Sequence, residues 1–324
     1  MPAMTMAKAL NEGLRRALED DPKVLVMGED VGPLGGVFRV TDGLQKDFGG
    51  ARVIDTPLAE AGIVGTAIGL ARRGYRPVVE IQFDGFVFPA LDQIVCQLAK
   101  LHARTAGQVR LPVVVRIPFG GGIGAVEHHS ESPETYLAHT AGLRVVSCAT
   151  PADAYWMIQQ SIAADDPVIL FEPKRLYWSK SDVDTAATPE PLHTARVVSP
   201  GTDCTLAAYG PSVQVCLAAA AAAATEGRSL EVVDLRSLTP LDTATLRASV
   251  LRTGRLVVVH EAPVFLGMGA EIAARITEAC FHSLEAPVLR VGGPYTPYPP
   301  ARLERDYLPD LDRVLDAVDR SLRY

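Results

Sequence analysis

The chain has 324 residues, which suits two domains of ordinary size. Apolar residues make up 48% and charged residues 21%, the balance of a folded globular protein and not of a disordered one. The net charge of -7 and a pI near 5.5 argue against nucleic acid or an anionic membrane as partner, because both attract basic surfaces.

No membrane span or export signal is expected. The longest apolar run, residues 215–224, reaches about half the length that a bilayer span needs. Charged side chains at Lys8, Glu12 and Arg15 interrupt the N-terminal stretch, so we expect a cytoplasmic location. The cysteines show no Cys-x-x-Cys spacing, which favours reduced, buried thiols over disulfides or zinc sites. They are Cys96, Cys148, Cys204, Cys216 and Cys280.

The first half of the chain alternates short β-branched runs with segments of helical period. This pattern predicts the α/β class, with doubly wound sheets covered by helices on both faces. Strands are expected at residues 24–27, 77–81, 113–117, 143–146 and 168–171, and helices at about 59–72, 86–103 and 151–163. Thr150 and Pro151 predict the start of the last helix, as N-cap and first helical residue.

A polar stretch without apolar period, residues 181–192, predicts the domain boundary. We expect an N-terminal domain at 1–180, a linker at 181–195 and a C-terminal domain at 196–324. The second α/β domain should have strands near 204–209, 230–233, 256–259 and 288–291, and helices near 213–226, 243–253 and 270–280.

Two stretches in the first domain carry polar residues at predicted strand ends. Residues 28–38, GEDVGPLGGVF, form a glycine-rich loop, and ligands of open α/β sheets bind at the carboxyl ends of strands. A surface loop with a solvated Glu29–Asp30 pair is an equal alternative. In residues 55–62, Glu60 lies in the first turn of a predicted helix, where a carboxylate usually serves only as a favourable partner for the helix dipole.

Two further stretches contain aromatic residues, glycines and histidines. Residues 80–86, EIQFDGF, suit either a pocket wall or core aromatics beside a helix cap. Residues 120–124 do not fit the dinucleotide fingerprint and predict a mobile loop. His128 and His129 follow this loop, and no third metal ligand has suitable spacing. A catalytic or hydrogen-bonding histidine is favoured over a metal site, and an ordinary histidine in a turn remains an alternative.

In their shared order, these motifs resemble the beta subunit of the decarboxylating component of 2-oxo acid dehydrogenase complexes, within the transketolase-like thiamine enzymes. The resemblance covers nearly the whole chain. It rests on GEDVG, DTPLAEAGIVGTAIGLA, EIQFDGFVFPALDQI, HHSESPE, DDPVILFEPKRLYW, VVDLRSLTPLD, TGRLVVVHEAP and GGPYTPYP. It implies a thiamine diphosphate pyrimidine-binding domain followed by a transketolase C-terminal-like domain.

The resemblance also implies the cofactor site. Glu60 matches the glutamate that hydrogen-bonds the pyrimidine ring and favours the tautomer that removes the thiazolium C2 proton. Such a carboxyl must hold or share a proton, which requires a buried apolar setting that Leu58, Ile63 and Phe86 are expected to supply. Leu58, Gln82 and Phe86 match positions that contact the cofactor, Phe86 by stacking.

His129 matches the family's active-site histidine, which is expected to stabilise charge on the 2-oxo acid and to assist acyl transfer to a lipoyl group. His128 departs from the aromatic residue that is common before it, and no role follows for it. The resemblance also implies a possible K⁺ site built largely from main-chain carbonyls. The matching positions are Val113, Ser161, Ile162, Ala164 and Asp166, the last in place of a usual asparagine.

The family needs a Gly-Asp-Gly segment for the diphosphate and its Mg²⁺, and this sequence has none. The resemblance therefore implies an alpha subunit that shares the thiamine diphosphate, mainly holds Mg²⁺ and completes an α2β2 heterotetramer. The C-terminal domain is then expected to serve the β–β contact and docking to a lipoyl-bearing acyltransferase core.

The expected reaction is oxidative decarboxylation of a 2-oxo acid with acyl transfer to lipoyl-lysine. The EIQFDGFVFPALDQI and HHSESPE segments favour branched-chain substrates such as 3-methyl-2-oxobutanoate. Pyruvate dehydrogenase and acetoin dehydrogenase beta subunits are alternatives. A non-catalytic scaffold subunit and a self-sufficient transketolase-like enzyme are two further alternatives.

Overall fold

A computed structural model describes residues 3–324. Contacts between residues divide these into two compact units. Unit 1 contains the described residues up to Phe119 together with Tyr136–Leu192, and unit 2 contains Gly120–Thr135 together with His193–Tyr324. Residues 120–135 therefore pack with the C-terminal unit, although the chain before and after them belongs to unit 1.

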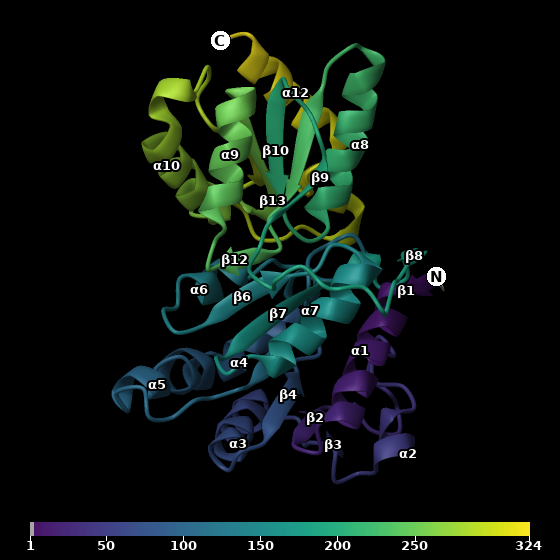
Figure 1. The fold of residues 1–324 in the computed structure, drawn as a ribbon. Coiled ribbons are helices and arrows are strands. Elements are labelled where there is room, and N and C mark those ends of the chain that lie inside the picture. The colour runs from purple at the N-terminus through teal and green to yellow at the C-terminus, as the bar shows by residue number, and fades with distance from the viewer. Residues whose placement is uncertain (1–2) are drawn as a thin grey trace. The chain divides into compact units, whose positions relative to one another are not determined.

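Unit 1 is built on a parallel sheet with strand order β6-β7-β5-β4-β2-β3 (Figure 1). The strands are β2 (Val24–Gly28), β3 (Val53–Asp55), β4 (Arg76–Glu80), β5 (Val114–Phe119), β6 (Arg144–Ser147) and β7 (Val168–Pro173). A separate antiparallel pair joins β1 (Ala3–Thr5) to β8 (Lys180–Asp182). Strands β2, β5 and β7 are buried along their whole length, as their continuous apolar runs predict.

Two pairs of helices pack together in unit 1, α1 against α7 and α3 against α4. Their bounds are α1 (Met6–Asp20), α2 (Leu44–Phe48), α3 (Glu60–Arg72), α4 (Val87–Asp92), α5 (Leu101–Arg104), α6 (Glu134–Ala138) and α7 (Pro151–Ala163), with short helices η1 (Asp84–Phe86), η2 (Gln93–Leu98) and η4 (Lys174–Leu176). Helix α7 begins as predicted, since the Thr150 side chain accepts from the N–H of Asp153 and Pro151 is the first helical residue.

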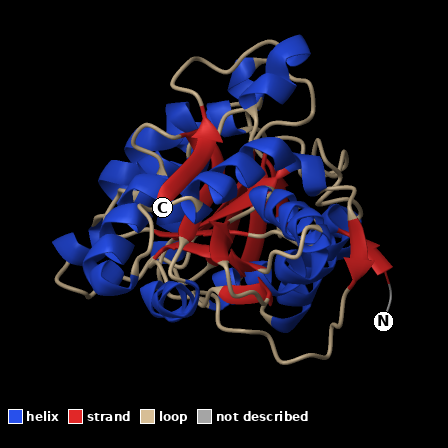
Figure 2. Cartoon of the chain, turned by 90° about the horizontal axis from the view of Figure 1, so that it is seen from above, coloured by secondary structure: helices blue, strands red, loops and turns tan. Residues whose placement is uncertain are grey.

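Unit 2 has a sheet of order β14-β13-β10-β11-β9, parallel except for β9. The strands of this sheet are β9 (Arg196–Ser199), β10 (Cys204–Ala208), β11 (Leu230–Asp234), β13 (Leu256–Pro263) and β14 (Leu289–Gly293), and the short strand β12 (Ser237–Thr239) lies outside it. Its helices are α8 (Ser212–Thr225), α9 (Thr243–Thr253), α10 (Met268–Cys280), α11 (Glu304–Tyr307) and α12 (Leu311–Leu322), with η3 (Glu127–His129), η5 (Phe281–Ser283) and η6 (Ala301–Leu303). Helix α8 packs with α12 and α9 with α10. Figure 2, a view of the whole chain from above, shows helices on both sides of the central strands.

These observations confirm the α/β class, and each predicted strand has a counterpart whose bounds agree within two residues, except that β13 continues four residues beyond the predicted end at residue 259. The predicted helix at 86–103 is wrong as a single element. It is divided into α4, the π-helix η2 and α5, because the N–H of Ala99 bonds to the carbonyl of Ile94, one residue beyond α-helical spacing. The sequence also did not predict β1 and β8, which are too short to show a period of two.

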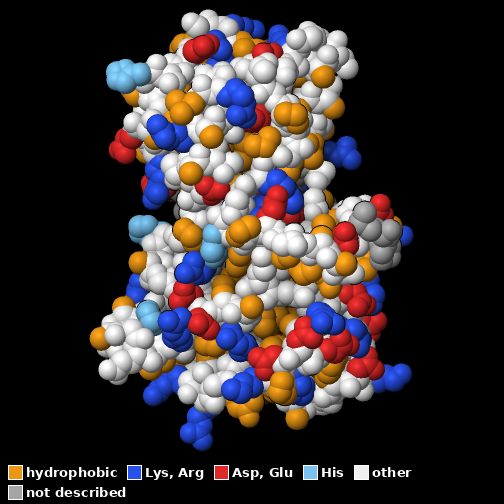
Figure 3. All heavy atoms as spheres, viewed as in Figure 1, with side chains coloured by type: hydrophobic (Ala, Val, Ile, Leu, Met, Phe, Trp, Pro, Cys, Tyr) orange, Lys and Arg blue, Asp and Glu red, His pale blue; other side chains and the backbone are white. Residues whose placement is uncertain are grey.

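The five cysteines are free, and four of them are buried. Cys96 is the exception to the predicted burial, because it lies on the outer side of η2. Across residues 3–324, no helix combines the length and the apolar character that crossing a membrane requires. Acidic and basic side chains are interspersed on the face shown in Figure 3.

Candidate active site

The carboxyl ends of β2, β3 and β4 lie level with one another in unit 1. In the strand register Gly28 pairs with Asp55 on one side and with Glu80 on the other. The residues that follow these strands therefore emerge at one edge of the sheet. Since β3 lies on one side of β2 and β4 on the other, the connection reverses direction here, and such a switch point is where open α/β sheets bind ligands.

The loop after β2 is held against the loop after β3. The N–H of Gly32 donates to Oδ1 of Asp55 at 2.6 Å, and the N–H of Thr56 donates to the carbonyl of Gly28 at 2.9 Å. A Cβ on Gly32 would lie 2.6 Å from the second oxygen of Asp55, so only glycine permits this approach. The two polar loops consequently form one rigid rim.

Glu29 is the buried acid of this rim, with 7% of its surface exposed. One of its carboxylate oxygens has no hydrogen-bond partner, while the main-chain N–H of Ala59 bonds to the group. Burial raises the pKa of Glu29, and the negative charges of Glu60 and Asp30 raise it further. The alternative of a solvated Glu29–Asp30 pair is therefore wrong for Glu29, although Asp30 is exposed.

Glu60 is the first residue of α3, and the N-cap residue Ala59 provides no side-chain cap. The negative charge of Glu60 helps to raise the pKa of Glu29, so the two carboxyl groups lie close enough to interact. Ile63 is buried, but Glu60 is half-buried and Leu58 is 78% exposed. Leu58 therefore does not bury Glu60 in this chain by itself, and the apolar setting of Glu60 stays a prediction.

Gln82 and Phe86 come from the segment after β4. The side-chain amide of Gln82 donates to Oδ2 of Asp30 at 3.1 Å and to the carbonyl of Glu29 at 3.4 Å, which places it on the same rim as Glu29. Phe86 ends the short helix η1, is half-buried, and meets Phe83 edge-on at 6.0 Å between ring centroids. The structure thus gathers Gln82, Glu29 and Glu60 at one edge, with Phe86 a short helix away from Gln82.

A buried charge network underlies this edge, and the sequence did not reveal it. Arg116 on β5 has no exposed surface and forms a bidentate pair with Glu172 on β7, at 2.7 and 2.8 Å. Its third nitrogen contacts Glu80 at 2.6 Å, and the Tyr177 hydroxyl donates to Glu172 at 2.7 Å. Burial raises the pKa of Glu80, whereas the charge of Arg116 lowers it. The network fixes the ends of β4, β5 and β7.

His129 lies in unit 2, in the helix η3. Its Nδ1 lies 2.9 Å from the carbonyl oxygen of His128, so that nitrogen carries the proton of the neutral ring, and Nε2 is the one able to accept a proton. The His128 ring meets the His129 ring at 4.3 Å between centroids. Among residues 3–324, no cluster of three or more His, Cys, Asp or Glu side chains is arranged to bind a metal ion.

The carbonyls that the sequence suggests for K⁺ come from the residue before β5 and from the last turn of α7 and the residues after it. Two of them, those of Ile162 and Ala164, accept from the guanidinium of Arg76 at 3.0 Å each. A carbonyl oxygen has a second lone pair, so these bonds do not exhaust the acceptors. The Asp166 side chain is paired with Arg144.

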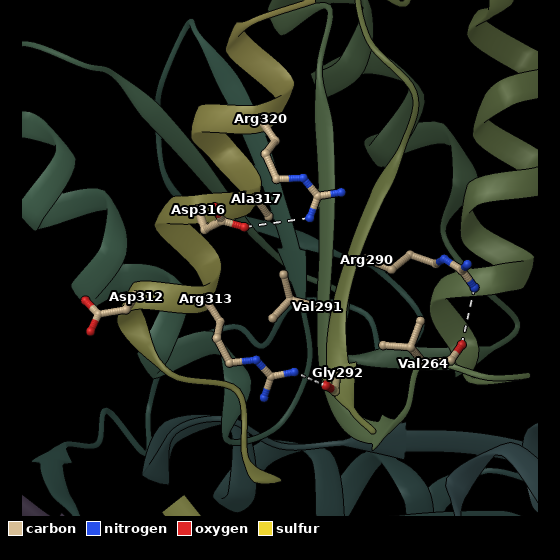
Figure 4. A pocket seen from close by; sticks show the side chains of 9 residues that line it. All are labelled: Val264, Arg290, Val291, Gly292, Asp312, Arg313, Asp316, Ala317 and Arg320. Atoms are coloured by element: carbon tan, nitrogen blue, oxygen red, sulfur yellow. Dashed lines mark hydrogen bonds and ion pairs between the residues drawn. The ribbon is translucent and has the colours of Figure 1, made fainter. Parts of the chain in front are cut away.

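A pocket of about 400 Å³ lies in unit 2 between β14 and α12 (Figure 4). None of the predicted site residues lines it. The guanidinium groups of Arg290 and Arg313 bond to main-chain carbonyls of Val264 and Gly292, and Arg320 is paired with Asp316. These arginines bond to residues of the same unit, and the lining of the pocket shares no residue with the site at the carboxyl end of β2.

Comparison with known families matches two consecutive regions of the chain. The family described as "Transketolase, pyrimidine binding domain" matches residues 2–179, and "Transketolase, C-terminal domain" matches residues 193–314. A solved structure titled "Split gene transketolase, inactive beta4 tetramer" superposes with a TM-score of 0.79. It is 22% identical and covers 99% of this chain and 98% of its own, which shows the fold.

Three relatives align over almost the full length. "Pyruvate dehydrogenase E1 component subunit beta" of Leifsonia xyli subsp. xyli is 66% identical, over 99% of this chain and 96% of its own. "3-methyl-2-oxobutanoate dehydrogenase subunit beta" of Mycobacterium tuberculosis is 56% identical, over 99% and 92%. "2-oxoisovalerate dehydrogenase subunit beta" of Pseudomonas aeruginosa is 46% identical, over 99% and 95%. The names of these relatives agree on a beta subunit and differ on the 2-oxo acid.

Proposed function

The chain belongs to the E1 beta subunits of the thiamine-diphosphate-dependent 2-oxo acid dehydrogenases, and from this premise we propose that it catalyses oxidative decarboxylation only together with an alpha subunit. The acyl group is passed to a lipoyl-lysine. The observation that supports this most is the pair of interacting carboxyl groups, Glu29 and Glu60, at the switch point of the unit 1 sheet.

This pair suits the pyrimidine ring of the cofactor. Thiamine diphosphate, when bound, supplies the nucleophilic carbon that attacks the carbonyl of the 2-oxo acid. Glu60 holds or shares a proton at the pyrimidine nitrogen, and Glu29 disfavours a second negative charge beside it. Gln82 and Phe86 offer an amide and an aromatic face for the same ring. His129 donates or accepts a proton during transfer of the acyl group.

Glu60 is only half-buried and its neighbours on α3 are exposed, which supports a partner subunit that covers the site. Leu58 is 78% exposed, and Ala61, Gly62 and Gly69 are exposed along α3. Small residues let another backbone approach closely, and a carboxyl that must hold a proton near neutral pH requires the enclosure that such a partner provides. The sequence has no Gly-Asp-Gly segment for the diphosphate. We therefore propose that an alpha subunit covers this face in an α2β2 heterotetramer.

The proposed metal sites are divided between the two subunits, as the cofactor site is. Mg²⁺ belongs with the diphosphate and is assigned mainly to the alpha subunit. The carbonyls of Val113, Ser161, Ile162 and Ala164, with Asp166, are the proposed K⁺ ligands of this chain. The C-terminal domain, residues 196–324, is the proposed contact for a second beta chain and for the lipoyl-bearing acyltransferase core.

Branched-chain 2-oxo acids such as 3-methyl-2-oxobutanoate are the proposed substrates. The relatives of Mycobacterium tuberculosis and Pseudomonas aeruginosa carry names of this type. Pyruvate is the second candidate, favoured by the name of the relative that is 66% identical.

Turnover of 3-methyl-2-oxobutanoate (2-oxoisovalerate) and of pyruvate by the purified alpha–beta complex, with an artificial electron acceptor, decides between these two substrates. The proposal predicts a higher kcat/KM for 3-methyl-2-oxobutanoate, and a preference for pyruvate would overturn the branched-chain assignment. Activity of the beta chain alone would overturn the need for a partner. Absence of turnover with either acid and with the related 2-oxo acids would favour a scaffold subunit.

A further inference from the structure

Residues 120–131 form a closed loop in unit 2. The N–H of Gly120 donates to the carbonyl of Glu131 at 2.9 Å, so the two ends of the loop meet. One limb contains the glycines of residues 120–124. The other limb contains His129, whose N–H bonds to the carbonyl of Val126 at 3.0 Å. The glycine limb and the turn that carries His129 are therefore joined at the base of the loop.

Two buried carboxylates from distant parts of the chain hold the glycine limb. Oε2 of Glu261 accepts from the N–H of Gly121 at 3.0 Å. The two oxygens of Glu304 accept separately from the N–H of Gly122, at 2.8 Å, and from the N–H of Gly124, at 3.1 Å. Hydrogen bonds from N–H groups to an ionised carboxylate are stronger than those between neutral groups. The predicted mobile loop is thus bonded through four of its five amides, three of them to these carboxylates.

The glycines are needed for this arrangement. Gly120, Gly122 and Gly124 have φ of 82°, 92° and 69°, a region that other residues rarely adopt. A Cβ on Gly120 would lie 2.6 Å from Oε2 of Glu261, and one on Gly121 would overlap the hydroxyl of Tyr298. A run of glycines has much backbone entropy to lose, so the loop depends on its carboxylate partners for order.

Glu304 is itself fixed by the GGPYTPYP motif, residues 292–299, to which the proposed function assigns no role. The hydroxyl of Tyr298 donates to Oε1 of Glu304 at 2.7 Å. Burial and the bond to Glu304 raise the pKa of Tyr298, so the phenol keeps its proton and remains a donor. Tyr298 packs with Tyr307 and Leu308 in a small buried cluster. The motif therefore presents Glu304 to the loop in one orientation.

The chain beyond the loop is anchored as well. The buried hydroxyl of Tyr209 on the β10 side of unit 2 donates to Oε1 of Glu134. His129 lies between this anchor and the glycine limb. Both ends of the histidine segment are consequently attached to residues of the C-terminal part of the chain.

We propose that Glu261 and Glu304 are positioning residues, which order the loop so that His129 is held where it acts in acyl transfer. This inference rests on the role proposed for His129. It assigns to the C-terminal part of the chain a part in catalysis that acts through His129 and is separate from its contacts with other subunits. A glutamine at position 304 keeps the size of the side chain but has one acceptor oxygen in place of two, so it should release one of the glycine amides.

Hydrogen–deuterium exchange of the assembled alpha–beta complex tests the ordering step. Glu304→Gln should speed exchange at least about tenfold in peptides that cover residues 120–131, because each lost bond lowers the protection of these amides. Tyr298→Phe, which leaves Glu304 in place but removes its fixed donor, should give a smaller change in the same peptides. The matched control is Glu271→Gln, since Glu271 is an exposed glutamate of unit 2 paired with Arg275. Unchanged exchange in both loop variants would overturn the proposal.

A double-mutant cycle tests the catalytic step by following acyl transfer to a lipoyl domain. Glu304→Gln should lower kcat by about 10- to 100-fold, the scale of a small misplacement of a catalytic group, with little change in KM for the 2-oxo acid. In a His129→Ala background the same substitution should change kcat by less than about twofold, because its effect passes through His129. A purely structural role predicts equal losses in both backgrounds, and that result would overturn the positioning role.

The two measurements also separate this inference from the function on which it rests. Full acyl transfer by His129→Ala would overturn the role of His129 and with it the positioning claim, while the exchange data would still decide whether the carboxylates order the loop. Lost acyl transfer by His129→Ala together with an unaffected Glu304→Gln would overturn the positioning claim alone.

Discussion

Replacing Arg116 by methionine should strongly destabilise unit 1. The guanidinium has no exposed surface and lies between Glu172, at 2.7 and 2.8 Å, and Glu80, at 2.6 Å. Its removal leaves two buried carboxylates without their cation, a change that costs about 3–5 kcal/mol in other buried pairs. For a domain of this size the loss corresponds to a fall of about 6–20 °C in melting temperature.

Urea denaturation followed by far-UV circular dichroism measures the effect. The pKa of Glu80 is already raised by burial, so its ionised form is the unfavourable one in the folded state. The loss in Arg116→Met should therefore be largest at pH 8 and shrink as the pH falls and the carboxyl groups take up protons. The triple variant Arg116→Met, Glu80→Gln, Glu172→Gln should recover much of the stability, and Arg275→Met, at an exposed ion pair, should change little. A loss below about 1 kcal/mol at pH 8 would refute the reasoning.

Three further predictions concern single side chains. Glu29→Gln should stabilise the fold at pH 8 but not at pH 4, because the raised folded-state pKa makes the ionisation of Glu29 cost stability as the pH rises above its ordinary pKa of 4.5, and this cost is complete above the raised pKa. The same variant should lower turnover of the complex. Equal stability changes at both pH values in urea titrations would contradict this. Burial lowers the pKa of His260 to about 4, so the wild type should lose about 2 kcal/mol of stability between pH 7 and pH 5, a loss that urea titrations of His260→Gln should no longer show. Gly69→Ala should stabilise the isolated chain by about 0.5–1 kcal/mol, because nothing lies within 4 Å of the new Cβ. The same substitution should weaken association with the alpha subunit in sedimentation experiments. Unchanged association would show that α3 is not part of the proposed contact.

The sequence predicted the class and most elements because buried parallel strands and capped helices have local signals. Residues 168–171 and Thr150–Pro151 are such cases, and both agree with the structure within a few residues. The division of the helix predicted at 86–103 carries no comparable signal, since π-helical spacing, as in the bond from the N–H of Ala99 to the carbonyl of Ile94, leaves no mark on the apolar period.

The site was predictable only where its parts follow a strand. Glu60 and Gln82 follow predicted strand ends, and both lie near the carboxyl end of β2 in the structure. The burial of Glu29 depends on how neighbouring loops pack, which local sequence does not encode. The order of the glycine loop depends on Glu261 and Glu304, more than a hundred residues away, so composition alone predicted mobility.

Glu60→Gln in the reconstituted alpha–beta complex tests the central claim most directly. The complex should assemble normally, because Glu60 is half-buried at the start of α3 and its side chain caps no helix. Turnover of the preferred 2-oxo acid should fall by about 100- to 10,000-fold, the range expected when a group that transfers or shares a proton is lost. Normal assembly with normal turnover would contradict the claim that Glu60 activates a cofactor shared with the alpha subunit.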